Sequence, residues 1–182
     1  MQLNEPFVDY LYSLAEGDRR GAMADLRRGL GEPPGSSPST FPYVAPFIKD
    51  SDRDTWREKA HYLVACLFAY YQAGGAEGVR ARVYGGNFGA HLRQAVQQGV
   101  EEKSLQPRVM ALLEAHRDDL PVLLRHMVSF LKSKSVPLNW DQLLRDLLYW
   151  NAPSRFVQKQ WADSFWGNIT RPDTPQSDTK DL

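Results

Sequence analysis

The sequence lacks the residues that most catalytic and metal sites require. It contains one cysteine, Cys66, which excludes an intramolecular disulfide and a zinc site built on cysteines. So little cysteine is typical of a reducing compartment, and we expect a cytoplasmic protein. The four histidines (His61, His91, His116 and His126) do not follow metal-ligand spacings such as HxxxH, and no acidic cluster accompanies them. We therefore expect no metal site.

Long hydrophobic runs and an excess of one charge are also absent. The N-terminus has neither the basic region nor the apolar segment of a signal peptide, and the longest apolar run, residues 62–71, is too short to span a membrane. The 22 basic and 22 acidic residues give a net charge of zero, so overall charge does not imply tight binding to nucleic acid. The segment GGNFG, residues 85–89, matches neither a P-loop nor a dinucleotide-binding motif.

What the sequence does contain is helical periodicity. Four of the five tryptophans lie between residues 136 and 166, spaced so that they share helix faces with leucine, valine and phenylalanine. This spacing predicts that Trp140, Trp150 and Trp161 belong to a core and do not stack on bases. Patterns typical of strands are nearly absent. Helices are predicted at residues 4–16, 19–30, 52–72, 87–98, 104–114, 118–132, 139–150 and 154–167.

Capping residues and loops divide the chain into parts. The predicted N-caps are Asp18, Asp52 or Asp54, Ser104, Asp118, Asn139 and Ser154. The segment GEPPGSSPS, residues 31–39, is expected to be exposed and mobile, and the glycine-rich segment 73–86 is a plausible boundary. We expect an all-α fold of two packed helical bundles with about eight to nine helices. The parts are an N-terminal bundle (1–86), a C-terminal bundle (87–167) and a disordered tail (168–182).

Basic residues are unevenly distributed along this neutral chain. Residues 120–160 contain six Lys or Arg against two acids. A local basic face on a neutral protein indicates a subunit that meets a polyanion within a larger assembly. The alternative is that each basic stripe is an ordinary solvated face. Local pairs at helical spacing, Asp25 with Arg28 and Asp141 with Arg145, support this alternative.

Six segments occur in an order and spacing typical of one family. They are FVDYLYSL, ADLRRGLGEP, FPYVAPF, GGNFGAHLR, LKSKSVPLNWDQLLRDLLYW and VQKQWADSFW, and they run from about residue 7 to residue 166. Together they resemble the CasB-type small subunit of the type I-E CRISPR surveillance complex, Cascade. The resemblance implies a non-catalytic, all-helical subunit without a cofactor, present in two copies beside the other Cascade subunits and the crRNA. It also implies sequence-independent binding to target DNA that stabilises the R-loop, notably its displaced strand, in antiviral defence.

The resemblance further implies which residues bind nucleic acid. The matching positions are Arg27, Arg28, Arg108, Arg125, Arg155 and either Arg53 or Arg57, and local charge adds Lys132, Lys134 and Lys159. Some of these arginines are expected to contact neighbouring protein subunits instead. Arg80 and Arg82 lie in a segment that departs from the family pattern, so their role stays open. A purely protein-binding helical scaffold is the alternative function, which the neutral charge favours. A third alternative is an enzyme, but the sequence contains no nucleophile–base or metal arrangement that supports it.

Overall fold

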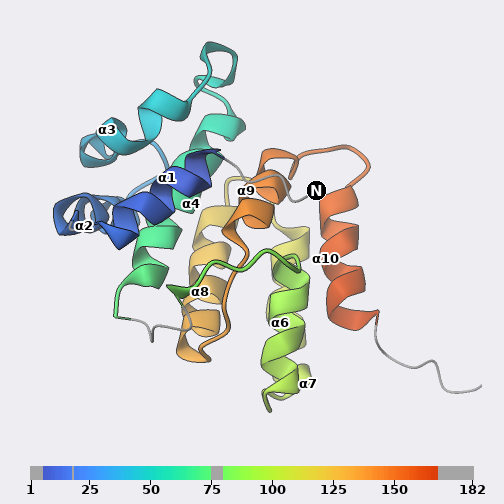
Figure 1. Cartoon of the computed structure of the whole chain (residues 1–182). Helices are drawn as coiled ribbons and strands as arrows, with labels where there is room; N and C mark the ends of the chain where they lie inside the picture. The colour runs from blue at the N-terminus through green and yellow to red at the C-terminus, as the bar shows by residue number, and fades with distance from the viewer. Residues whose placement is uncertain (1–5, 18, 75–79, 168–182) are drawn as a thin grey trace, which may run out of the picture.

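The computed structural model describes residues 6–17, 19–74 and 80–167. Within these ranges the chain forms nine α-helices, three short 3-10 helices and no strand, which confirms the predicted all-α fold. The 3-10 helices are Pro38–Thr40, Ala45–Phe47 and Asp50–Asp52. The α-helices are α1 (Pro6–Glu16), α2 (Arg20–Gly29), α3 (Phe41–Val44), α4 (Trp56–Gln72), α6 (Phe88–Gln97), α7 (Glu102–Glu114), α8 (Leu120–Ser133), α9 (Trp140–Leu148) and α10 (Phe156–Trp166) (Figure 1). The predicted disordered tail lies outside the described residues.

Helix α4 lies at the centre because it is apolar on nearly all sides. Helices α1 and α2 pack on one side of it, and α8 and α9 pack on the other (Figure 1). Near its start, the indole N–H of Trp56 donates to the carbonyl of Leu147 at 2.6 Å, and near its end the hydroxyl of Tyr71 donates to the carbonyl of Val136. The helix predicted over residues 52–72, within the predicted N-terminal bundle, therefore contacts both halves of the chain. The division into two bundles at residue 86 stays a prediction.

The tryptophans of the C-terminal third are core residues, as their spacing predicts. Trp140, Trp150 and Trp161 are each at most 2% exposed. The rings of Trp150 and Trp161 lie 5.0 Å apart, and the indole N–H of Trp161 donates to the carboxylate of Asp146 at 2.6 Å. Their rings are thus unavailable for stacking on nucleic-acid bases.

Helix starts match the predicted N-caps only in part. Asn139 caps α9 as predicted, because its side-chain oxygen accepts the backbone N–H of Gln142 at 3.0 Å. Thr55, and not Asp52 or Asp54, caps α4 by accepting the N–H of Arg57 at 3.1 Å. For α7, α8 and α10 the observed N-cap positions are Glu101, Asp119 and Arg155, in place of Ser104, Asp118 and Ser154. Neighbouring residues compete for each cap, and backbone geometry decides between them. The predicted cap Asp18 lies outside the described residues.

The segment 31–39 is not exposed throughout, so that prediction is wrong at its C-terminal end. Ser37 is 7% exposed, and Thr40, just after the segment, is 1% exposed. The hydroxyl of Thr40 donates to the carbonyl of Ser37 at 2.7 Å, which closes a buried turn against α2. Polar composition predicts exposure, but a serine or threonine whose hydrogen bonds close locally can be buried.

His91 joins α6 to the start of α9. Its Nε2 accepts the backbone N–H of Asn139 at 3.1 Å, and the residue is 5% exposed. Burial lowers the pKa of His91 to about 4, because the charged imidazolium would lose its water; a hydrogen bond with Gln94 offsets part of this effect. An Nε2 atom that accepts a hydrogen bond must be unprotonated, so the fold requires neutral imidazole here.

Acidification from pH 7 to pH 5 is expected to destabilise the protein through His91. The pKa is near 6.5 in the unfolded chain and about 4 in the folded one. The unfolded state therefore takes up the proton first, and stability falls as the pH drops through 6.5 toward 4. The expected loss is about 2 kcal/mol in the free energy of unfolding, measured by urea denaturation.

The matched variant is His91→Gln, whose amide oxygen can accept the same hydrogen bond without titrating. We expect its stability to vary less over this pH range than that of the wild type. Burial also raises the pKa of Asp146, but this group is present in both proteins and its contribution cancels. Equal pH dependence in the two proteins would contradict the role given to His91.

Candidate nucleic-acid interface

Neither a metal cluster nor a membrane-spanning helix is found in the described residues. They contain no group of three or more His, Cys, Asp or Glu side chains that could hold a metal ion. No helix among them is long and apolar enough to cross a membrane. Cys66 is buried in α4, and burial raises the pKa of its thiol to about 12. The thiol is therefore protonated and unreactive near neutral pH.

Three of the predicted arginines form ion pairs with nearby acids. The pairs are Arg28 with Asp25 (2.5 Å), Arg53 with Asp50 (3.0 Å) and Arg57 with Asp52 (3.2 Å). Arg57 also donates to the carbonyl of Leu148 at 3.4 Å, so it is held more firmly than Arg53. Partly exposed pairs contribute little to stability, and a phosphate can replace the carboxylate at small cost. The Asp25–Arg28 pair was expected from helical spacing and is confirmed.

Lys132 contacts the end of a neighbouring helix. Its Nζ donates to the carbonyls of Tyr70 and Ala73, at 2.7 and 2.5 Å, and lies 4.4 Å from the centre of the Tyr70 ring. The ammonium group thus satisfies carbonyls at the C-terminus of α4, where a positive charge also complements the helix dipole. In this structure Lys132 stabilises the contact between α8 and α4.

Arg125 and Arg155 also donate to main-chain carbonyls. Arg125 reaches the carbonyl of Leu30 at 3.2 Å from α8, and Arg155, which precedes α10, reaches the carbonyl of Leu113. Each joins segments that are distant in sequence. Both residues are exposed overall, and the guanidinium of each also contributes a contact to the fold.

The remaining predicted residues, Arg27, Arg108, Lys134 and Lys159, are exposed. Within the described part of the chain, none of these four side chains forms a hydrogen bond or an ion pair. Arg108 and Lys134 lie in one cleft of about 570 Å³ between the start of α7 and the end of α8, and the Arg108 guanidinium lies 5.9 Å from the centre of the Phe130 ring. Lys159 stands apart from them on α10.

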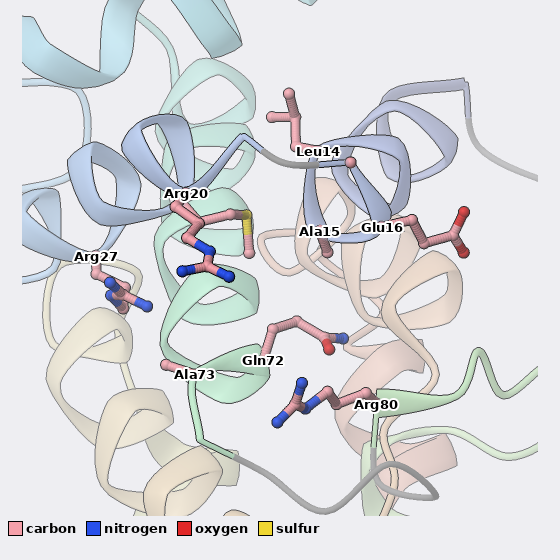
Figure 2. Close-up of a pocket in the computed structure, with 10 residues that line it drawn as sticks. Leu14, Ala15, Glu16, Arg20, Arg27, Gln72, Ala73 and Arg80 are labelled. Carbon is pink, nitrogen blue, oxygen red and sulfur yellow. The ribbon is translucent and has the colours of Figure 1, made fainter.

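Arg27 lies in a second cleft, where the fold adds two arginines that were not among the predicted site residues. This cleft, of about 500 Å³, is lined by Arg20, Arg27, Gln72 and Arg80 among others, and we call it the arginine cleft (Figure 2). Arg20 shares a helix with Arg27, and its polar position on α2 was visible in the sequence. The sequence around Arg80 does not indicate that it lines this cleft, because only the tertiary fold brings it beside α2.

An exposed aromatic pair was also not predicted from the sequence. Tyr149 is 53% and Phe156 is 37% exposed, and their ring centres lie 6.0 Å apart. The guanidinium of Arg57 lies 5.7 Å from the centre of the Tyr149 ring. Helical periodicity assigned both aromatics to helices but could not show that they face outward together.

Fold and surface together define an all-helical protein with cationic clefts, and comparison with known proteins identifies its family. A profile of the family described as CRISPR-associated protein Cse2 matches residues 22–166. A CRISPR-associated protein Cse2 from Thermus thermophilus is 34% identical over 170 residues, 92% of each chain. This chain belongs to the Cse2 family, which confirms the resemblance to CasB-type subunits.

Solved structures agree with this assignment. The crystal structure of CasB from Thermus thermophilus matches with a TM-score of 0.76 and 34% identity, over 92% of this chain and 99% of that one. A chain in a structure described as a CRISPR RNA-guided surveillance complex matches with a TM-score of 0.74 and 27% identity, over 87% of this chain and 88% of that one. The similarity therefore extends over nearly the whole length of these relatives.

Proposed function

We propose that this chain is the non-catalytic small subunit of a type I-E CRISPR RNA-guided surveillance complex. In this role it binds nucleic acid without sequence specificity and stabilises the displaced DNA strand of the R-loop in antiviral defence. Its partners are the other Cascade subunits, the crRNA and target DNA, and a second copy of itself. Membership of the Cse2 family and the similarity to a chain of a surveillance complex support the assembly role.

One observation carries the nucleic-acid-binding part of the proposal. Cationic side chains from separate segments gather in two clefts, Arg108 with Lys134 in one and Arg20, Arg27 and Arg80 in the other. Arg and Lys that contact phosphates bind any sequence, because the backbone carries no base information. In RNA-guided recognition the base pairs read the sequence, so a subunit that only holds a strand needs no base-reading residues.

Replacing Arg108 and Lys134 with glutamine is expected to weaken binding to single-stranded DNA. Each lost phosphate contact should lower the slope of log K against log salt by about one, so the double variant should lose about two. The measurement is fluorescence anisotropy with oligonucleotides of unrelated sequence, over a series of salt concentrations. All the oligonucleotides should bind the wild type alike.

The control is Lys132→Gln, which removes a lysine two positions before Lys134. It should lower stability, since Lys132 satisfies carbonyls at the end of α4, but leave the salt slope of the folded protein unchanged. If the Arg108/Lys134 variant kept the wild-type affinity and slope, this surface would not bind DNA. If the wild type bound no single-stranded DNA even at low salt, the nucleic-acid role would be wrong.

That last outcome would favour the alternative of a purely protein-binding helical scaffold. The exposed pair Tyr149 and Phe156 is the observation that supports it, because aromatic residues are enriched in protein interfaces. The net charge of zero is also compatible with a subunit that contacts only protein.

A further inference from the structure

We propose that the groove between α7 and α8 is a protein-docking site, which takes a large apolar side chain from an acidic segment of a partner protein. This inference rests on the assembly role in the proposed function and names one surface that serves it. The groove has a volume of about 530 Å³ and is lined by Pro107, Arg108, Ala111, Leu123, His126 and Met127. We call it the α7–α8 groove.

The α7–α8 groove is hollow because small side chains on α7 meet larger ones on α8. Pro107 and Ala111 lie one turn apart on α7, so both are on one face of that helix. Leu123 and Met127 lie one turn apart on α8 and form the opposite wall. A proline and an alanine are too short to fill the space between the helices, and both are exposed, so the groove opens to solvent. Met127 is 3% exposed, which gives the groove a buried apolar floor.

The charged part of the lining favours an acidic partner. None of the described residues that line the α7–α8 groove is acidic, and its two polar members are Arg108 and His126. Both are exposed, and neither side chain forms a hydrogen bond or an ion pair in the described part of the chain. A carboxylate beside the inserted side chain can therefore pair with Arg108 without displacing an acid of this chain.

The apolar character of the groove favours a protein over a phosphate backbone. Four of its six lining residues are apolar, whereas phosphates bind to N–H and O–H donors. Val122 lies one turn before His126 on α8 and is 58% exposed, so the apolar surface continues beyond the groove. Exposed apolar residues beside a hollow are typical of protein interfaces. Arg108 also lines the neighbouring cleft that contains Lys134, so it lies at the border between the two surfaces.

The first experiment identifies what occupies the groove. The photo-crosslinking residue benzoylphenylalanine replaces Ala111, which is exposed and lines the groove, so the variant should fold. The variant is bound to a complex of crRNA and the other Cascade subunits, prepared without the small subunit and without target DNA, and is then irradiated. We expect mass spectrometry to find a crosslink to a protein segment in which an Asp or Glu lies within one helical turn of a large apolar residue. The same replacement at Gln106, which is exposed on another side of α7, is the control and should not crosslink to that segment.

The second experiment tests the charge of the partner with two matched variants. Ala111→Glu and Ala111→Lys introduce long side chains at the same position, so both share any steric effect. The glutamate lies one turn from Arg108, where it can pair with that arginine and repel an incoming carboxylate. We expect Ala111→Glu to bind the same complex with at least a roughly tenfold higher Kd, and Ala111→Lys to lose less.

The outcomes separate this inference from the proposed function. If the wild type did not bind the complex, the assembly role itself would be wrong. If the wild type bound, the inference alone would be overturned by a crosslink to crRNA, to a second copy of this chain or to a segment without acids, and equally by the absence of any crosslink. Equal losses of affinity in the Glu and Lys variants, or no loss in either, would also overturn the acidic partner.

Discussion

Replacing Gly89 with alanine is expected to lower the Tm by about 6 to 12 °C, which corresponds to about 3 kcal/mol in a chain of this length. Gly89 is buried in α6, where this helix packs along α10 (Figure 1). A Cβ at this position would lie 2.0 Å from the carbonyl oxygen of Trp161 and 2.8 Å from its Cα. Backbone atoms cannot rotate away, so the two helices would have to separate.

That separation would also disturb the contacts on either side of the glycine. The rings of Phe88 and Trp161 lie 5.0 Å apart, and the side-chain amide of Asn87 donates to the carbonyl of Gln160 at 3.2 Å. Alanine favours helix over glycine by about 1 kcal/mol, but this gain is smaller than the cost of the clash. Thermal unfolding followed by circular dichroism measures the difference.

The matched control is Gly21→Ala in α2. Apart from its chain neighbours and the backbone of its own helix, nothing lies within 4 Å of a Cβ built at Gly21, so only the helix propensity changes. This variant should be more stable than the wild type by about 0.5 to 1 kcal/mol. If both glycine variants shifted the Tm equally, the close approach of α6 and α10 would not explain why position 89 requires glycine.

Replacing Arg82 with methionine is expected to cost about 3 kcal/mol in the free energy of unfolding. Its guanidinium donates to both carboxylate oxygens of Asp141, at 2.7 and 3.0 Å, and also to Asp9. Asp141 is 3% exposed, so the variant would leave a buried carboxylate without its bidentate partner. Arg82 also lies 5.0 Å from the centre of the Tyr12 ring, a cation–π contact that methionine cannot make.

Burial alone would lower the pKa of Arg82, but its hydrogen bonds to Asp141 and Asp9 outweigh burial and raise the pKa above its ordinary value.

Arg28→Met is the control for the predicted loss of stability in the Arg82 variant. The side chain of Arg28 is 70% exposed and its pair with Asp25 should contribute less than about 1 kcal/mol. Adding Asp141→Asn to the Arg82 variant should restore part of the lost stability, since it removes the buried charge. If urea denaturation showed equal losses in the free energy of unfolding for the Arg82 and Arg28 variants, the larger contribution of the buried Arg82–Asp141 pair would be contradicted.

The fold was predictable because it depends on burial of apolar side chains at regular spacing. The positions of Trp140, Trp150 and Trp161 specify buried helix faces whatever their partners are, and all three are in the core. Contacts between residues that are distant in the sequence cannot be predicted from local spacing. Gly89 is the example, since the sequence shows a glycine near the start of a helix but not the carbonyl of Trp161 that requires it.

The candidate site was less predictable for the same reason. Helical spacing pairs Asp141 with Arg145, which stays a prediction, but it gives no sign of Arg82, which the fold brings to Asp141 from 59 positions away. Basic residues are easy to recognise, but only tertiary contacts show that Lys132 caps α4 while Lys134 stays exposed two residues later. The role of each predicted residue in binding nucleic acid remains a prediction for the experiments above.

Arg82 follows Arg80 by two positions, so the carboxylates of Asp9 and Asp141 also anchor one wall of the arginine cleft. Asp9 is on α1 and Asp141 is on α9, and neither lines the cleft. The wall is therefore preorganised, and a strand that settles there would lose little entropy to the ordering of protein. The position of Arg80 would therefore depend on how Arg82, two residues later, joins Asp9 of α1 to Asp141 of α9.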